Sequence, residues 1–232
     1  MSHLLERYGA PIDTQLDNFE KYIRRQSMSR FLARYELFKM QMNTKGCIIE
    51  CGVHHGGGLM AWAKLSSALE PYALDRRVFG FDTFEGFPSV SEKDVGNVDN
   101  ARTAVGGLAT GYDVFAELNE LVAEYDENRF LNQFQKVFMV RGDATQTIPR
   151  FVEENPYLLV SLLFLDFDLY EPTRAALTHF LPRMPRGSIL AFDELNNPWW
   201  PGETVAALEM LNLNDRAIQR FSFDPNISYI VM

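Results

Sequence analysis

The sequence predicts an α/β protein in which helices flank a mostly parallel sheet. From Gly46 onward, short runs of β-branched and aromatic residues alternate with longer stretches of helical periodicity, which is typical of strands joined by helical crossovers. A cluster of glycines follows the first apolar run, at Gly52 and at residues 56–58. Only a short connection containing DPNI separates the last two expected strands, which therefore form an antiparallel hairpin, because a parallel crossover needs about a dozen residues.

Each expected element follows from the period of its apolar residues. Strands are expected at residues 47–51, 78–81, 137–140, 158–165, 188–192, 218–222 and 228–231. Helices are expected at residues 59–69, 114–126, 148–154, 172–181 and 203–211, after an amphipathic helix at residues 29–42. The chain thus divides into an N-terminal helical arm, residues 1–45, and one α/β domain, residues 46–232.

One segment of the domain, residues 89–112, has glycines, asparagines and charges but little periodicity. A structureless segment of this length inside a domain is usually functional or disordered. We expect a lid-like insertion over the site, and a plain surface excursion is the alternative.

Composition restricts the partners of the protein. The 232 residues are 47% hydrophobic, enough for one substantial core, and the formal net charge of −9 argues against a nucleic-acid partner. No apolar stretch approaches the roughly 18 residues of a membrane span, and no leader of signal type is visible, so we expect a cytoplasmic protein without a membrane partner. Cys47 and Cys51 share one expected strand, too far apart for a disulfide.

The glycine-rich turn predicts a site for a nucleoside-like ligand. Backbone without side chains can approach a ligand closely, and Asp82 follows about two dozen residues later, where a carboxylate accepts ribose hydroxyls. The glycine spacing departs from G-x-G-x-x-G, so a pyrophosphate cradle is less well supported. Glu50, at the end of the first strand, faces the ligand or, alternatively, caps the turn.

Acidic residues follow the fourth and fifth expected strands, in LLFLDFDLYEPT and ILAFDELNNP. Asp166, Asp193 and Glu194 could converge as an oxygen-only site, which suits Mg²⁺ better than zinc. Asp168 is a fourth candidate. The alternative for Asp168 and Glu171 is that they open the following helix near its positive dipole end.

Two further groups lie at the same edge of the expected sheet. Trp199 and Trp200 could form a flat apolar wall for a substrate or plug the core. His54 and His55 lie in the glycine-rich turn, either against the ligand or in solvent. Glu203 is expected simply to begin the next helix.

The motifs ECGVHHGGG, VFGFDTFEGFP, LFLDFDLYEPT and LAFDE resemble, in order and spacing, the macrocin O-methyltransferase family of class I S-adenosylmethionine-dependent enzymes. The resemblance implies a Rossmann-like seven-stranded methyltransferase sheet with an antiparallel last strand and helices on both faces. It also implies S-adenosyl-L-methionine as cofactor, Mg²⁺ as the metal, and a hydroxyl of a sugar or polyol on a small molecule as acceptor.

The resemblance also assigns roles to particular positions. Cofactor contacts fall on Glu50, Gly52, Val53, Gly56, Gly57, Gly58, Asp82, Thr83, Asp143 and Ala144. Asp166, Asp193 and Glu194 correspond to the metal-binding carboxylates, and Asp166 is the expected proton acceptor. Relatives tend to have two adjacent aspartates where this chain has Asp193 and Glu194, which puts the substrate and the metal geometry in question.

Three other interpretations remain open at the level of sequence. A nicotinamide-dependent oxidoreductase also needs glycines and an acid at Asp82, although no catalytic Tyr-Lys or His pair is evident. A phosphatase or nucleotide-sugar transferase would use the D-x-D pattern, and a catalytically silent cofactor-binding protein would lack a working metal site. The amphipathic helix at residues 29–42 could join a homo-oligomer interface.

Overall fold

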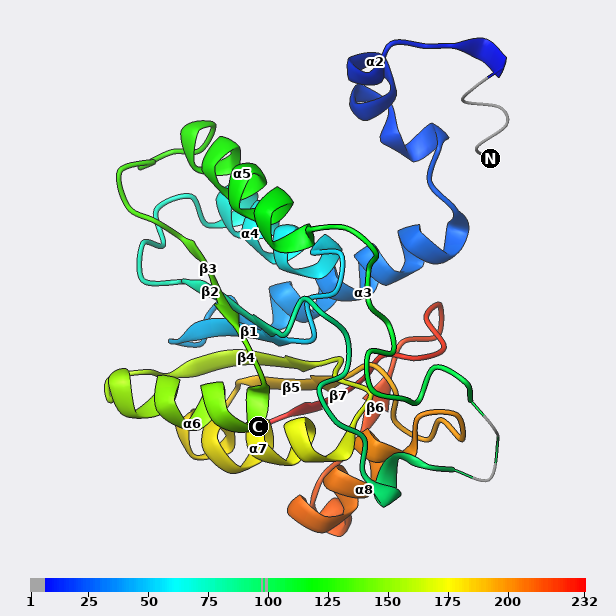
Figure 1. Ribbon diagram of the computed structural model, residues 1–232. Helices are drawn as coiled ribbons and strands as arrows, with labels where there is room; N and C mark the ends of the chain where they lie inside the picture. The colour runs from blue at the N-terminus through cyan, green and yellow to red at the C-terminus, as the bar shows by residue number, and fades with distance from the viewer. Residues whose placement is uncertain (1–6, 97, 99) are drawn as a thin grey trace.

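The computed structural model describes residues 7–96, 98 and 100–232, and a seven-stranded sheet runs through its middle in the order β3-β2-β1-β4-β5-β7-β6 (Figure 1). The strands are β1 (Cys47–Cys51), β2 (Val78–Asp82), β3 (Val137–Arg141), β4 (Val160–Leu165), β5 (Ile189–Phe192), β6 (Gln219–Arg220) and β7 (Ser228–Val231). β1 to β5 pair in parallel, whereas β7 is antiparallel to both β5 and β6. The predicted fold class is confirmed.

Helices cover both faces of the sheet (Figure 1). One face carries α3 (Arg25–Gln41), α4 (Gly57–Leu69) and α5 (Val114–Glu127), and the other carries α6 (Ala144–Glu154), α7 (Tyr170–Phe180) and α8 (Pro201–Met210). Consecutive strand residues alternate between the two cores: Ile48 belongs to the first hydrophobic cluster and Ile49 to the second. Both faces are therefore buried, which explains the continuous apolar runs of the central strands.

The first described part of the N-terminal arm, residues 7–24, stands apart from the sheet (Figure 1). It contains α2 (Ile12–Asp17) and a 3₁₀ turn, η1 (Phe19–Lys21), before α3, and α2 has no buried residue. The first six residues of the expected arm lie outside the described part of the chain. Within the described part of the arm, α3 is the helix that packs into the core, where Ala33, Leu37 and Phe38 are fully buried.

Element boundaries differ from the expected ones in a few places. α6 begins at Ala144, a full turn before the predicted start, because the Asp143 side chain caps it by accepting a 2.9 Å bond from the Thr145 N–H. β6 is only a two-residue edge strand. Short 3₁₀ turns occur at η2 (Glu92–Asp94), η3 (Leu181–Arg183) and η4 (Leu213–Asp215).

Both cysteines are free, as predicted. Across the described ranges, no helix combines the length and the apolar character that a bilayer span requires.

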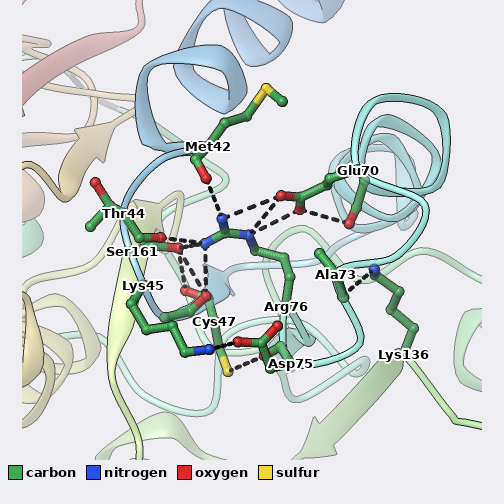
Figure 2. Close-up of polar contacts among 12 residues, drawn as sticks. Met42, Thr44, Lys45, Cys47, Glu70, Ala73, Asp75, Arg76, Lys136 and Ser161 are labelled. Carbon is green, nitrogen blue, oxygen red and sulfur yellow. Dashed lines mark hydrogen bonds and ion pairs between the residues drawn. The ribbon is translucent and has the colours of Figure 1, made fainter.

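A buried arginine joins several elements at the end of the sheet where the parallel strands begin (Figure 2). Arg76 is 6% exposed, and its guanidinium pairs with Glu70 at the end of α4. Its other acceptors, each at 2.8 to 2.9 Å, are the carbonyls of Met42, Thr44 and Gly46 and the hydroxyl of Ser161. The end of α3, the turn into β1 and strand β4 are therefore connected through one side chain.

We expect Arg76→Lys to lower the free energy of unfolding by about 2 kcal/mol, because one ammonium cannot reach the same acceptors and leaves buried carbonyls unpaired. Arg77→Lys is the matched control, since the Arg77 guanidinium makes one long 3.4 Å bond to the Tyr157 hydroxyl. The control should change stability by no more than about 0.5 kcal/mol. Urea unfolding followed by circular dichroism measures both, and equal effects would show that the Arg76 network contributes little.

Candidate active site

A cavity of about 520 Å³ lies at the carboxyl ends of the parallel strands. It lies where the strand order reverses between β1 and β4, the place where ligands bind in open α/β sheets. The predicted site residues that line it are Glu50, Gly52, Val53, Gly57, Gly58, Asp82, Thr83, Asp143, Ala144, Asp166, Asp193, Glu194 and Trp200. Gly56 and Trp199 are not among the lining residues.

The glycine-rich turn is shaped partly by contacts within the protein. Gly52 has φ +92°, and a Cβ there would lie 1.9 Å from the carbonyl oxygen of Asp166. A Cβ on Gly58 would lie 1.8 Å from Oε1 of Glu50, whereas one on Gly57 would meet nothing within 4 Å. A Cβ on Gly56 would lie 2.2 Å from a methyl of Leu118. Three of the four glycines therefore lie against other protein atoms, and Gly57 is the one that leaves space open.

Asp82 holds the same turn from the end of β2. Its Oδ2 accepts the N–H groups of Val53 at 2.7 Å and His54 at 2.8 Å, and its Oδ1 accepts the N–H of Phe84 at 2.7 Å. A carboxylate can accept about four hydrogen bonds, so capacity remains for a ligand hydroxyl. The contact of Asp82 with a ribose stays a prediction, and its role in ordering the turn is an additional one that the sequence did not indicate.

Glu50 is a buried acid with an incomplete set of partners. It is 1% exposed, its Oε1 lies 3.9 Å from a guanidinium nitrogen of Arg34, and its Oε2 has no hydrogen-bond partner among the described residues. Burial raises the pKa of Glu50 to about 8. No described N–H of the turn donates to it, which favours the ligand-facing interpretation over the capping one.

The acidic residues reach the cavity because the strand ladders continue past the strands. The N–H of Asp166 donates to the Cys51 carbonyl at 2.7 Å, and that of Asp193 donates to the Leu165 carbonyl at 2.9 Å. Asp166, Asp168, Asp193 and Glu194 all line the cavity. The sequence prediction that these acids share one edge of the sheet is correct.

Burial and mutual repulsion perturb these carboxyl groups. Burial, and then the charge of Asp193, raises the pKa of Asp166 and of Glu194. Burial, and then Glu194 and Asp193, raises the pKa of Asp168 to about 8. Such crowding of like charges in a cavity is characteristic of functional sites.

Asp168 belongs to the cavity rather than to the helix that follows. It has φ +61°, an uncommon conformation for a residue other than glycine, and α7 starts after Leu169 without a side-chain cap. Glu171 does lie in the first turn of α7, where it pairs with Arg174 on the surface. The site interpretation therefore applies to Asp168, and the helix-start interpretation applies to Glu171.

Two arginines from α3 face the acids, and the sequence analysis missed both. A guanidinium nitrogen of Arg30 lies 3.5 Å from Oδ2 of Asp166 and also bonds Oδ2 of Asp193. Arg34, one turn further along, faces Glu50, and its guanidinium lies 5.4 Å from the ring centre of Phe164. Burial alone would lower the pKa of Arg30, but Asp193 and Asp166 raise it more, so the guanidinium stays protonated. The sequence signal that could have found Arg30 and Arg34 is their spacing of four residues, which places both on one face of an amphipathic helix.

Glu203 does more than begin α8. It is fully buried, and its Oε2 accepts the N–H of Glu194 at 3.0 Å. The neighbouring Thr204 hydroxyl accepts the N–H of Asn196 at 2.8 Å. The start of α8 therefore holds the acidic turn after β5 in place.

The segment 89–112 forms one wall of the cavity. Asp94 anchors it by accepting the N–H of Tyr170 at 2.6 Å, and Asn100 donates to the carbonyl of Trp199 at 3.2 Å. Ser89, Arg102, Leu108 and Thr110 contribute lining side chains, although residues 97 and 99 are outside the described part. Movement of the segment as a lid remains a prediction.

The two tryptophans have different places. Trp200 lines the cavity and packs edge-on against Phe87, with 5.7 Å between the ring centres. Trp199 is 51% exposed. Of the two tryptophans, Trp200 is therefore the one that belongs to the cavity, and its contact with a substrate stays a prediction.

The donor chemistry of the acids suits a hard divalent cation, because it is all carboxylate oxygen. Asp193 Oδ1 is buried and has no hydrogen-bond partner in the part of the chain that the structure describes. In the described residues, however, no three such side chains are grouped to hold a metal ion, and Arg30 lies on Asp166 and Asp193 instead. The donors fit the cation, but their present partner is a guanidinium.

This sheet order, with a glycine-rich turn after β1 and an acid at the end of β2, defines a methyltransferase of the Rossmann-like class. The profile of the macrocin O-methyltransferase (TylF) family matches residues 22–206. The chain belongs to this family and is an S-adenosylmethionine-dependent O-methyltransferase. The oxidoreductase, phosphatase and silent-protein alternatives are therefore set aside.

Solved structures agree with this assignment. The crystal structure of CalS11, a calicheamicin methyltransferase, is 35% identical, with a TM-score of 0.93 over 99% of this chain and 89% of that one. An apo structure of CalS11, named as a TDP-rhamnose 3′-O-methyltransferase of calicheamicin biosynthesis, is 32% identical, with a TM-score of 0.84 over 99% and 90%. The O-methyltransferase NovP, at 23% identity and a TM-score of 0.63 over 88% and 79%, shares the fold. A comparison with curated protein sequences gave no match.

Proposed function

We propose that the enzyme transfers the methyl group of S-adenosylmethionine to a hydroxyl of a sugar carried by a small molecule, with a divalent cation such as Mg²⁺ assisting. The observation that carries this proposal is the meeting of the glycine-rich turn and four carboxylates in one cavity. The sugar acceptor is supported by the similarity to CalS11, which is named as acting on TDP-rhamnose.

The cofactor would lie along the β1, β2 and β3 ends of the cavity. Glu50, protonated at neutral pH because its pKa is raised to about 8, would become charged when the cationic amino group of the methionine half approaches. Gly57 leaves room beside it. Asp82 would accept the ribose hydroxyls with its remaining capacity, and Asp143 would lie on the adenine side.

The acceptor would enter beside β4 and β5. In the transfer, the acceptor oxygen attacks the methyl carbon, the bond from that carbon to sulfur breaks, and S-adenosylhomocysteine leaves. The hydroxyl proton would pass to Asp166, a carboxylate that lines the cavity on the acceptor side. A bound divalent cation lowers the pKa of a nearby hydroxyl and orients vicinal oxygens. Asp166, Asp193 and Glu194 are the residues that would hold it.

Calorimetric titration with S-adenosylhomocysteine, with NAD⁺ as the competing ligand, tests the cofactor. A Kd of about micromolar for S-adenosylhomocysteine and no heat with NAD⁺ is expected. Mass spectrometry after incubation with S-adenosylmethionine and TDP-rhamnose, free rhamnose or a rhamnoside then tests the acceptor. If the protein binds the cofactor but methylates neither these compounds nor any other sugar offered, the proposal of a sugar acceptor is refuted.

A further inference from the structure

Arg30 occupies an unusual position between the arm and the catalytic edge of the sheet. Its helix, α3, is fixed in the core through Ala33, Leu37 and Phe38, which are fully buried. Its side chain, 30% exposed, lines the cavity and contacts acids from both β4 and β5. No other described cation pairs with Asp166 or Asp193.

The carboxylate atoms that Arg30 contacts are among those a cation would need. Its guanidinium nitrogen lies 3.5 Å from Oδ2 of Asp166 and bonds Oδ2 of Asp193. A metal ion that bridged the two acids through these oxygens would lie within a few ångströms of the guanidinium, where two positive charges repel strongly at low dielectric. The guanidinium and a bound cation therefore cannot hold the same oxygens at once.

The single positive charge of Arg30 does not neutralise all the carboxylates that line the cavity. Asp193 is 2% exposed, yet its Oδ1 has no hydrogen-bond partner among the described residues and lies in a side chain that lines the cavity. Asp168 and Glu194 also line the cavity, and neither forms an ion pair with a described residue. A buried acceptor without a partner is costly, so it marks a place where a further ligand is favourable.

We propose that Arg30 is a built-in counter-ion that exchanges with the divalent cation: it holds Asp166 and Asp193 before loading and leaves them when the cation binds. The inference rests on the cation of the proposed function. In this scheme Arg30 is a positioning residue that keeps two repelling acids in place and sets the affinity of the site. A helix of the N-terminal arm, α3, thereby controls metal loading.

Cation titration of the cofactor-free protein tests the exchange without measuring turnover. Mg²⁺ is titrated by calorimetry, and Mn²⁺ by electron paramagnetic resonance of the free ion. Arg30→Gln keeps a polar side chain but removes the competing charge, so it should bind both ions about tenfold more tightly or better. Arg30→Lys restores a charge with fewer donors and should fall between Arg30→Gln and the wild type.

Arg25→Gln is the matched control, because Arg25 is an exposed residue at the start of the same helix. It should bind both ions as the wild type does, and urea unfolding of all variants checks that each is folded. Equal or weaker binding by Arg30→Gln would overturn the exchange and leave the cation of the proposed function intact. If neither the wild type nor any folded variant binds either ion, both the exchange and the cation of the proposed function are overturned. Failure of the methyltransferase assignment would show separately, as absence of S-adenosylhomocysteine binding.

Discussion

Asp166→Asn is expected to lower kcat for methyl transfer by about 10²- to 10⁴-fold, the range typical of removing a positioned proton acceptor. The substitution preserves the size of the side chain and the backbone bond from Asp166 to the Cys51 carbonyl. It removes the negative charge that Arg30 now pairs with and that a cation would use. Binding of S-adenosylhomocysteine should change by less than about threefold, since the affected group lies on the acceptor side.

Steady-state kinetics and the calorimetric titration separate these two effects. Glu171→Gln is the control, because Glu171 is a nearby acid that pairs with Arg174 on the surface, and it should leave kcat unchanged. Asp168→Asn is the decisive comparison, since Asp168 also lines the cavity and has a pKa raised to about 8. A larger loss in Asp168→Asn than in Asp166→Asn would transfer the proton-acceptor role to Asp168.

Gly52→Ala is expected to lower the free energy of unfolding by about 3 kcal/mol or more and to abolish cofactor binding. The added Cβ would lie 1.9 Å from the Asp166 carbonyl oxygen, and the backbone there has φ +92°, which disfavours any side chain. Neither strand can yield easily, because β1 and β4 pair without interruption from Ile48 opposite Leu162 to Cys51 opposite Leu165, in the centre of the sheet.

Gly57→Ala is the matched control in the same turn. A Cβ on Gly57 meets nothing within 4 Å, and the residue is the first of α4, where alanine is favourable. Its unfolding free energy should stay equal to that of the wild type or rise slightly. Urea unfolding compares the two variants, and similar stability would mean that the turn can shift away from β4.

Local pattern was sufficient for much of this fold. Alternation and apolar runs placed every strand, because strands buried on both faces have continuous apolar sequence. The DPNI connection required the antiparallel end of the sheet, which β6 and β7 confirm. The cap at Asp143 is also a local signal, yet it was overlooked, and α6 was predicted to start too late.

The place of the acids could be predicted because topology alone brings strand ends together. Asp82, Asp166 and Asp193 each end or follow a parallel strand. They therefore lie at the same edge of the sheet, independently of the contacts that their side chains make. The family resemblance then assigned roles to these positions. Its roles for Mg²⁺ and for the acceptor remain proposals.

The partners of those acids depended on tertiary structure. Arg30 pairs with Asp166 across 136 residues, and Glu203 supports Glu194 from the next helix. The angle and distance at which α3 and α8 pack on the sheet decide such contacts, and no residue type or spacing near the acids encodes them. The left-handed backbone of Asp168 likewise follows from the junction it must make between β4 and α7.

By itself, the sequence determined the class of sheet, the position of the site and the family, because these follow from periodicity and from motifs local in the chain. Only the tertiary structure decided that a guanidinium from the arm helix faces the acids of the cavity and that segment 89–112 is anchored at Tyr170 and Trp199. The physical reason is that charge pairing acts through space at a few ångströms, between side chains that the chain order leaves far apart.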